Sequence, residues 1–284
     1  MLPVYSASEI KRWDGFTIDH LPISSVDLME KAAEACFLWI RKNLPNQNRF
    51  VVFCGNGNNG GDGLAVARKL YESGQQVFVV EVPITNNPSK DYIQNLNRLI
   101  QLGFKGFIDI NGEGLKHSYI STDTWIVDAL VGYGLNRIPD QELSLAIRII
   151  NSSECPTLSI DIPSGMYTDQ PTPHEFVHSE VTLTFQAPKL AQLLAGTGQY
   201  CGKLVILDIG LLPDYMSLVP PAFRYLESKD ISPYYKMRNL FSFKNQFGHV
   251  VIVGGQLGMA GACSLAGLAA IRSGAGLTSI CSYA

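Results

Sequence analysis

The sequence predicts an α/β protein built on a mostly parallel sheet that helices cover on both faces. From residue 50 onward, short apolar segments alternate with segments of helical spacing, which is typical of a parallel α/β fold. The short segments have fully apolar cores, such as FVVFC at 50–54 and WIV at 125–127, as in strands buried on both faces. The segment 50–63 has the order strand, glycine loop, helix. This order suits phosphate binding, because glycines let the backbone approach an anion and a helix N-terminus offers free N–H groups.

Two helices are expected before this alternation begins. Ser6 and Glu9 have the spacing of a capping box, which predicts a first helix after Ser6. A second helix is expected from Ser24 or Ser25, where apolar residues recur every three or four positions. Pro45 is expected to end it.

The alternating part continues to about residue 212. Helices are expected at 64–73 and 89–102, each followed by a glycine, and AQLLAG at 191–196 is also expected to be helical. Pro139 is expected in the first turn of a helix over QELSLAIRII, whereas 111–122 is polar and uncertain. Strands are expected at 50–54, 77–82, 106–110, 124–128, 157–161, 180–185 and 203–209.

After Leu212 the pattern loosens, and residues 213–247 are interpreted as a linker with a partial strand at FRYLE. A new strand–glycine–helix unit begins at Gly248 and is too short to be a domain by itself. The segment 250–271 carries no charge, so a membrane span is an alternative there. Five glycines interrupt it, and two buried elements joined by a glycine turn are the preferred interpretation.

Composition narrows the class of protein. The 284 residues suffice for one large domain, or for one domain and part of another. The net charge of −3 provides no basic surface for nucleic acid, and the N-terminus lacks the apolar core of a signal peptide. The six cysteines have no metal-binding spacing, so reduced, buried thiols and a cytoplasmic location are expected, without nucleic-acid or membrane partners.

Polar side chains gather where three of the predicted strands end. Asn58, Asn59 and Asp62 follow the first strand, Asp128 ends another, and Asp161 ends a third, which Ser164 follows. Ligands of open parallel sheets bind at the carboxyl ends of the strands. Any one of these residues is a common turn residue, but the three strand ends together favour a site. Oxygen donors without His or Cys favour a hard cation, and a monovalent cation is one candidate.

Three other features are weaker. His174 and His178 lie four residues apart in a proline-containing stretch, and a solvated loop is preferred there over a metal pair. Lys189 is interpreted either as a phosphate ligand or as a surface cap. Ser164 lies in PSG and not in a nucleophile elbow, which gives a hydrolase little support.

A competing interpretation is an NAD-dependent dehydrogenase. Gly55, Gly57 and Gly60 satisfy the dinucleotide fingerprint, and Glu81 lies where a ribose-binding acid is expected. Asn-Asn at the variable positions, the extension of the loop through Asp62 and the two preceding helices all disfavour it.

Five separated motifs carry a resemblance to a known family. GNGNNGGDG, TWIVDALVGYGLNR, SIDIPSG, TLTFQAPK and GKLVILDIGL occur in this order, and residues 1–215 thereby resemble the NAD(P)H-hydrate epimerase family, or YjeF N-terminal domain. The resemblance implies a Rossmann-like three-layer α/β/α sandwich, often a homo-oligomer, with one bound potassium ion. It implies the interconversion of the R and S forms of NADHX and NADPHX, the hydrated nicotinamide cofactors.

The resemblance also assigns residues. It implies that Asn59, Asp128 and Ser164 bind potassium, and that Asp161 contacts the substrate. The implied substrate-binding residues are Asn58, Asn59, Gly60, Gly61, Asp62, Gly132, Tyr133, Gly134, Leu135, Asn136, Arg137, Ile138 and Asp161.

The tail resembles the beginning of a second enzyme domain. FGHVVIVGGQLGMAGACSLAGLAAIRSGAGL is similar to the opening of the ribokinase-like, ADP- or ATP-dependent dehydratase domain of bifunctional repair enzymes. The expected organisation is an epimerase domain at 1–215, a linker at 216–247 and a truncated dehydratase part at 248–284. Dehydratase activity is therefore not expected from this chain as given.

The preferred mechanism has one acid–base residue. Inverting the carbon that carries the hydroxyl group requires a bond at that carbon to open and re-form, and Asp161 is the residue expected to give and take the proton. The alternative from another class is a non-catalytic Rossmann-like module for binding or dimerisation. The complete set of polar residues disfavours that alternative.

Overall fold

The computed structural model describes residues 1–110, 123–135, 137–235 and 237–282. These residues divide into two compact units, Met1–Glu227 and Ser228–Ala284. Each unit is described by itself.

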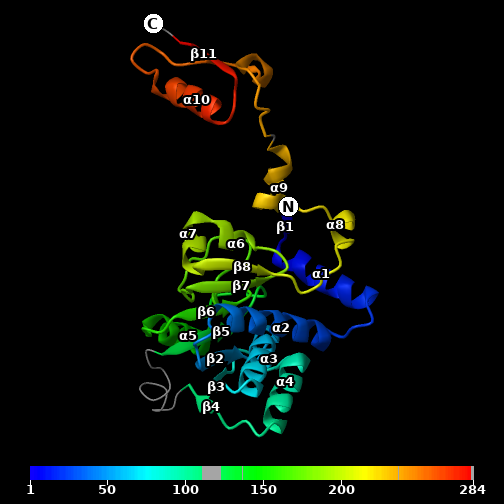
Figure 1. Cartoon of the computed structure of the whole chain (residues 1–284). Helices are drawn as coiled ribbons and strands as arrows, with labels where there is room; N and C mark the ends of the chain where they lie inside the picture. Colours follow the sequence, from blue (N-terminus) through cyan, green and yellow to red (C-terminus); the bar gives the residue numbers. More distant parts are fainter. Residues whose placement is uncertain (111–122, 136, 236, 283–284) are drawn as a thin grey trace. The chain divides into compact units, whose positions relative to one another are not determined.

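A parallel sheet of seven strands forms the centre of the first unit (Figure 1). Its strand order is β4-β3-β2-β5-β6-β7-β8, and every neighbouring pair is parallel. The predicted fold class is thereby confirmed. The strands are β2 (Arg49–Gly55), β3 (Gln76–Val82), β4 (Phe107–Asp109), β5 (Thr124–Ala129), β6 (Thr157–Ile160), β7 (Val181–Phe185) and β8 (Lys203–Leu207).

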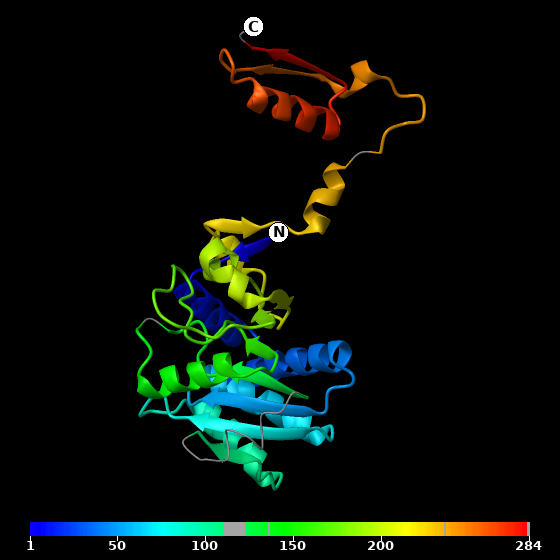
Figure 2. The ribbon, with the colours of Figure 1, turned by 90° about the vertical axis from the view of Figure 1, so that its left-hand side faces the viewer.

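Alternate side chains of β2 pack into two hydrophobic cores, one on each face of the sheet. Phe50, Val52 and Cys54 pack with one set of helices, and Val51 and Phe53 pack with α5 (Gln141–Ser152) on the opposite face. Side chains alternate along a strand, so a strand that is apolar throughout can bury both of its faces. The helices of the first set are α2 (Ser25–Asn43), α3 (Asn58–Glu72) and α4 (Lys90–Gln101), and Figures 1 and 2 show the three layers.

Most helix ends lie where the sequence predicts them. Ser6 and Ser24 form capping boxes at α1 (Ala7–His20) and α2, and Ser89 caps α4. The prediction for Pro139 is wrong: the side chain of Asp140 caps α5 by accepting from the N–H of Leu143, so the proline precedes the cap.

The glycine loop is shorter than predicted. α3 begins at Asn58 and not at residue 64, so Asn59, Gly60 and Asp62 lie in its first turns. Three glycines in this stretch weaken the helical signal. The argument that Asp62 extends the loop, which was used against a dehydrogenase, is therefore wrong.

The segments after β7 differ in detail from expectation. The helix predicted at 191–196 is broken at Leu194 into α6 (Leu190–Leu193) and α7 (Ala195–Gly198), and Gln199–Cys201 forms a 3-10 turn. α8 (Tyr215–Leu218) follows β8. The partial strand predicted at FRYLE is confirmed as β9 (Phe223–Tyr225), which pairs antiparallel with β1 (Leu2–Val4).

The second unit contains the predicted strand and helix. β10 (His249–Val253) pairs in parallel with β11 (Leu277–Cys281), and α10 (Gly261–Arg272) lies between them in the chain. The expectation that both elements are buried is wrong: Val253 is 80% exposed and Leu265 is 70% exposed, because a two-stranded sheet and one helix cover little apolar surface. Short helical turns occur at Ser228–Ile231, Ser232–Tyr234 and Lys244–Phe247.

Two further expectations concern membranes and thiols. Among the residues that the structure describes, no helix has the length and apolarity to cross a membrane. All six cysteines are free, as predicted, but Cys281 is exposed and not buried.

Candidate functional site

The N-terminus of α3 lies at the carboxyl end of β2. Gly57 is the N-cap residue and makes no side-chain hydrogen bond to the helix, so the first backbone N–H groups lack a side-chain partner. A Cβ atom on Gly60 would lie 1.5 Å from the carbonyl oxygen of Gly55. Glycine at position 60 therefore lets the helix begin directly against the strand, where its N–H groups and dipole favour an anion.

Asn59 joins this helix to the loop after β5. Its side chain is buried, and its Nδ2 atom has no hydrogen-bond partner among the described residues. Its Oδ1 atom lies next to Gly132, where an added Cβ would come within 3.2 Å. An unpaired buried amide is costly unless a ligand or water satisfies it. Asn59 thus marks a place where a polar group is expected to bind.

Asp128 is the fully buried centre of a hydrogen-bond network between strand ends. Its Oδ2 atom accepts from the Ser164 N–H at 2.8 Å and from the Ser159 hydroxyl at 2.7 Å. Its Oδ1 atom accepts from the Leu130 N–H at 3.3 Å. The Ser164 hydroxyl accepts from the N–H of Val131 and donates to its carbonyl oxygen. Burial raises the pKa of Asp128, and the hydrogen bonds oppose this rise.

Asp161 and Lys189 form an ion pair in the interior. Lys189 Nζ donates to Asp161 Oδ1, to the Thr184 hydroxyl at 2.8 Å and to the Phe185 carbonyl at 3.2 Å. Both charged side chains are almost completely shielded from solvent. The suggestion that Lys189 caps a surface is therefore wrong.

Backbone geometry holds this pair in place. Asp161 has a φ of 68°, which ends β6 one residue before the predicted boundary. Gln192 accepts from the Lys189 N–H and donates to the Asp161 carbonyl at 2.7 Å. A non-glycine residue in this conformation is strained and needs such support.

Two further carboxyl groups interact with this ion pair. Asp62, on α3, has a raised pKa because of burial and the charges of Asp161 and Asp14. Asp14, on α1, accepts a hydrogen bond from the Tyr133 hydroxyl at 2.9 Å. Burial raises the pKa of Asp14 to about 6. The surroundings of the ion pair therefore combine three acidic groups, Asp161 included, with one buried lysine.

The residues of the predicted substrate loop 132–138 have different surroundings, and only some of them face the site. Gly132 and Tyr133 face the site through Asn59 and Asp14, and Leu135 packs against the α5 core. Arg137 donates to the Ile84 carbonyl at 3.1 Å and pairs with Asp140, and the side chain of Ile138 is 72% exposed. Gly134 and Asn58 are exposed, Gly61 is buried against Met29, and Asn136 lies outside the described residues.

The three residues predicted to bind potassium carry donor atoms that suit this ion. Asn59, Asp128 and Ser164 supply an amide oxygen, a carboxylate and a hydroxyl, which are hard donors. The Asp128 carboxylate is buried and has no ion pair among those found in the described part of the chain. A buried carboxylate calls for a compensating cation. The unpaired atom of Asn59 is its Nδ2 donor, so this residue would bind a cation through Oδ1.

The remaining candidates have ordinary structural roles. His174 contacts the Gly165 carbonyl, and His178 stacks on Tyr200. Glu81, the acid of the dehydrogenase hypothesis, accepts from the Tyr92 hydroxyl at 2.5 Å. No group of three or more His, Cys, Asp and Glu side chains suited to a metal occurs within the described ranges.

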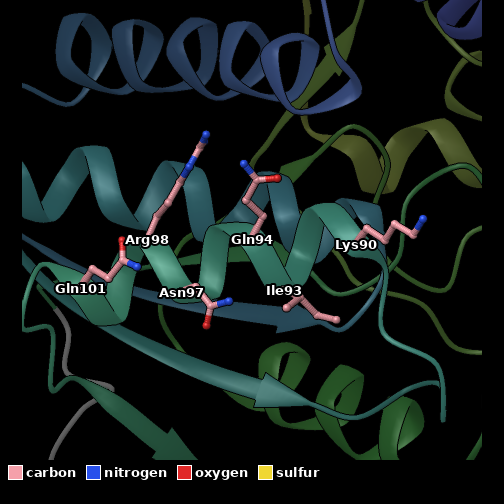
Figure 3. A pocket seen from close by; sticks show the side chains of 6 residues that line it. All are labelled: Lys90, Ile93, Gln94, Asn97, Arg98 and Gln101. Atoms are coloured by element: carbon pink, nitrogen blue, oxygen red, sulfur yellow. The ribbon is translucent and has the colours of Figure 1, made fainter.

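A hollow on α4 shares no lining residue with this site. It has a volume of about 470 Å³, and Figure 3 shows its six lining side chains along the helix. None of them is a predicted site residue, and Arg98 is engaged with Glu30 at 2.7 Å. The lining residues are Lys90, Ile93, Gln94, Asn97, Arg98 and Gln101.

Sequence reasoning missed Asp14 and the pairing of Lys189. Asp14 lies in a helix with no motif, more than a hundred residues before Tyr133. Lys189 carried a usable signal, because it follows the apolar segment 180–185 as Asp161 follows 157–160. Adjacent parallel strands bring such residues to the same edge.

Comparisons with known proteins agree with this architecture. Residues 25–191 match the family described as YjeF-related protein N-terminus. A protein from Escherichia coli (strain K12), called bifunctional NAD(P)H-hydrate repair enzyme Nnr, is 31% identical over 98% of this chain and 53% of its own length. A protein of the same name from Coxiella burnetii is 32% identical over 99% of this chain and 56% of its own length.

The chain spans about half the length of these curated relatives. Among solved structures, the crystal structure of yeast ynu0, YNL200c, covers 80% of this chain and 98% of its own, with a TM-score of 0.65 and 20% identity. This likeness shows a shared fold.

Proposed function

This chain belongs to the YjeF-related protein N-terminus family, and we propose that it epimerises the R and S forms of NADHX and NADPHX. The observation that carries the proposal is the buried Asp161–Lys189 pair, with Asp62 beside it on the helix that begins at the glycine loop. The names of the relatives support the substrate class. The dehydrogenase alternative is disfavoured because Glu81, its ribose-binding acid, already accepts a hydrogen bond from the Tyr92 hydroxyl.

The N-terminus of α3 would bind the pyrophosphate of the substrate. The N–H groups at the start of α3 and the backbone around Gly55 and Gly60 suit a pyrophosphate, because glycine permits close approach. The loop around Gly132 and Tyr133 would then lie along the nucleotide. The hydrated ring would then lie toward the carboxyl groups.

The reaction needs a group that both accepts and returns one proton. In the ring-opening route, Asp161 takes the proton of the substrate hydroxyl, and the bond from that carbon to the ring nitrogen breaks with its electron pair going to nitrogen. Rotation of the resulting carbonyl group and return of the proton close the ring with the opposite configuration. In the other route, Asp161 in its protonated form gives its proton to the hydroxyl, which leaves as water with the electron pair of the C–O bond, and the ring nitrogen stabilises the cation that remains. Water then adds to the other face of that carbon and gives a proton back to Asp161. In either route Lys189 holds the side chain of Asp161 in place by donating to its Oδ1 atom.

We also propose potassium as the cofactor of this domain, bound by Asn59, Asp128 and Ser164. When bound, the ion supplies positive charge near the phosphates and need not take part in bond breaking. The residues themselves tie the ends of β5 and β6 together through the Asp128–Ser164 hydrogen bond. Dehydratase activity with ADP or ATP is not proposed for the residues described.

A chromatographic assay tests the proposed activity. Pure R-NADHX is incubated with the protein, and formation of the S form is followed against a blank without protein, which measures the spontaneous reaction. Asp161→Asn should lower the rate on the order of 10²- to 10⁴-fold, because proton transfer is lost. Asp19→Asn, an exposed change on α1, is the matched control.

Two results would contradict the proposal. Binding of NADHX without conversion would favour the non-catalytic alternative. Near-normal turnover by a folded Asp161→Asn variant, with folding checked by circular dichroism, would remove Asp161 from the mechanism.

A further inference from the structure

Asp14 belongs to the site although no motif contains it. It lies on α1, before the residues 25–191 that match the family. Its Oδ2 atom accepts the hydrogen bond of the Tyr133 hydroxyl at 2.9 Å. Tyr133 comes from the loop after β5, so this contact joins the N-terminal helix to the proposed substrate loop.

The charged groups around Asp14 come from several elements. Lys189 and Asp161 act on it from the ends of β7 and β6, and Asp62 acts from α3. The pKa of Asp14 is raised to about 6, first by burial; the Tyr133 hydrogen bond and Lys189 lower it, and Asp161 raises it. Asp14 therefore changes its charge within the range of ordinary assays.

Tyr133 is held on both sides. Its hydroxyl donates to Asp14, and its carbonyl oxygen accepts from the Thr168 hydroxyl at 2.9 Å. Burial and the neighbouring carboxylates, Asp14 first, raise the pKa of Tyr133, so the phenol keeps its proton. Its hydrogen points to Asp14 when that group is ionised, and the lone pairs of its oxygen remain available.

We propose that Asp14 is a positioning residue of the epimerase site, which acts through Tyr133 by setting the direction of the tyrosine's hydrogen bonds. This inference rests on the proposed function. With Asp14 ionised, Tyr133 presents an oxygen lone pair that accepts from a donor group of the bound substrate other than the hydroxyl whose proton Asp161 takes. With Asp14 protonated, the carboxyl group donates to Tyr133, and the tyrosine turns its hydrogen toward the substrate. The proton on Asp14 thus selects between two arrangements of one side chain.

The pH dependence of epimerisation tests this role. For the wild type, kcat/KM should rise about five- to tenfold from pH 5 to pH 7.5, with an inflection near pH 6. The rise has this sign because a charged acceptor holds the tyrosine more firmly than a neutral one. Asp14→Asn should lose the inflection and run about tenfold below the wild type at pH 7.5, whereas Asp14→Glu should restore it in part.

Two further variants separate positioning from folding. Tyr133→Phe keeps Asp14 but removes its link to the substrate, so its profile should also be flat. Asp19→Asn, an exposed change on the same helix, should keep the wild-type profile. A flat profile in the control would show that any change on α1 disturbs the site, which would overturn the role.

Thermal unfolding supplies a readout apart from activity. A carboxyl group whose pKa is raised on folding destabilises the folded state above that pKa, so stability is lost as pH rises from about 4 through 6. Asp14→Asn should therefore raise Tm at pH 7.5 by roughly 2–4 °C and by less at pH 4.5. Equal shifts at both pH values would show that Asp14 does not titrate as the geometry requires.

The two proposals fail in different ways. A wild type that does not epimerise NADHX overturns the proposed function and, with it, the role of Asp14. An active wild type whose Asp14→Asn variant keeps the inflection near pH 6 overturns the role of Asp14 alone.

Discussion

The Asp161–Lys189 pair is a costly arrangement for a protein interior. Both charges lie away from water, and Asp161 has a φ of 68°, a left-handed backbone that costs free energy. The pair persists because Thr184, Phe185 and Gln192 satisfy its remaining hydrogen bonds. Strain and buried charge without a structural need are typical of functional sites.

A double-mutant cycle measures this pair. Lys189→Met leaves the Asp161 carboxylate buried without its partner and should lower the free energy of unfolding by roughly 3–5 kcal/mol. The double variant Asp161→Asn/Lys189→Met should be more stable than the sum of the single losses predicts, since no uncompensated charge remains. Urea denaturation monitors both, with Lys105→Met on the exposed surface as the control.

Additive losses in that cycle would contradict direct coupling of the two charges.

For single residues, the sequence predicted that Asp128, Asp161 and Ser164 belong to a site, because they lie at or after the ends of strands that meet at one edge of the sheet. Asp128 and Ser164 are indeed hydrogen-bonded. Asp14 could not be predicted, because its proximity to Tyr133 depends on where α1 packs.

The helix α3 shows why glycine-rich segments mislead prediction. In an isolated helix, glycine costs about 1 kcal/mol relative to alanine. Here Gly60 and Gly63 allow contacts that a Cβ would block: Gly60 faces the Gly55 carbonyl and Gly63 faces the Ala129 side chain. Close packing against these partners reverses the usual preference for alanine over glycine in a helix. Local sequence does not identify such partners.

Two glycine substitutions with opposite expected signs test this explanation. Gly60→Ala should destabilise the protein by about 3 kcal/mol or more, because the new Cβ would lie 1.5 Å from the Gly55 carbonyl oxygen. Gly15→Ala, inside α1 with nothing within 4 Å of its Cβ position, should stabilise it by up to about 1 kcal/mol. Denaturant unfolding of both variants gives the comparison, and a stable Gly60→Ala protein would refute the close-packing account.

Potassium binding should be visible in the stability of the whole molecule. A ligand that binds only the folded state stabilises it by RT ln(1 + [L]/Kd), or about 1–3 kcal/mol for a concentration ten to a hundred times Kd. We therefore expect a higher Tm in potassium chloride than in choline chloride at equal ionic strength. Asn59→Ala should lose this difference, because the amide is one of the proposed ligands.

The comparison of Tm in the two salts extends to a second proposed ligand. Asp128→Asn should also lose the potassium effect, but its buried hydrogen-bond network makes it prone to misfolding, so Asn59→Ala decides the question. Identical Tm values for the wild type in the two salts would contradict the potassium proposal. That result would leave the epimerase proposal to its own assay.

The first unit also shows how the chain closes on itself. β1 pairs with β9, and the Tyr5 hydroxyl donates to the Val219 carbonyl at 2.5 Å. These contacts extend the compact unit to Glu227, beyond residue 215, the last residue of the resemblance. The domain boundary at 215 stays a prediction, and the pairing of the two end strands favours a later one.

The sequence by itself determined the elements, because apolar period and capping residues act over a few positions. Alternation of apolar segments with helical ones predicted the parallel sheet, and the capping residues Ser6 and Ser24 predicted two helix starts. It also placed Asn59, Asp128 and Asp161 at strand ends. Only the tertiary structure decided that Lys189 is buried against Asp161, that Asp14 reaches Tyr133 and that α3 begins within the glycine run. Those features depend on contacts between segments far apart in the chain, and local pattern carries no information about such distances.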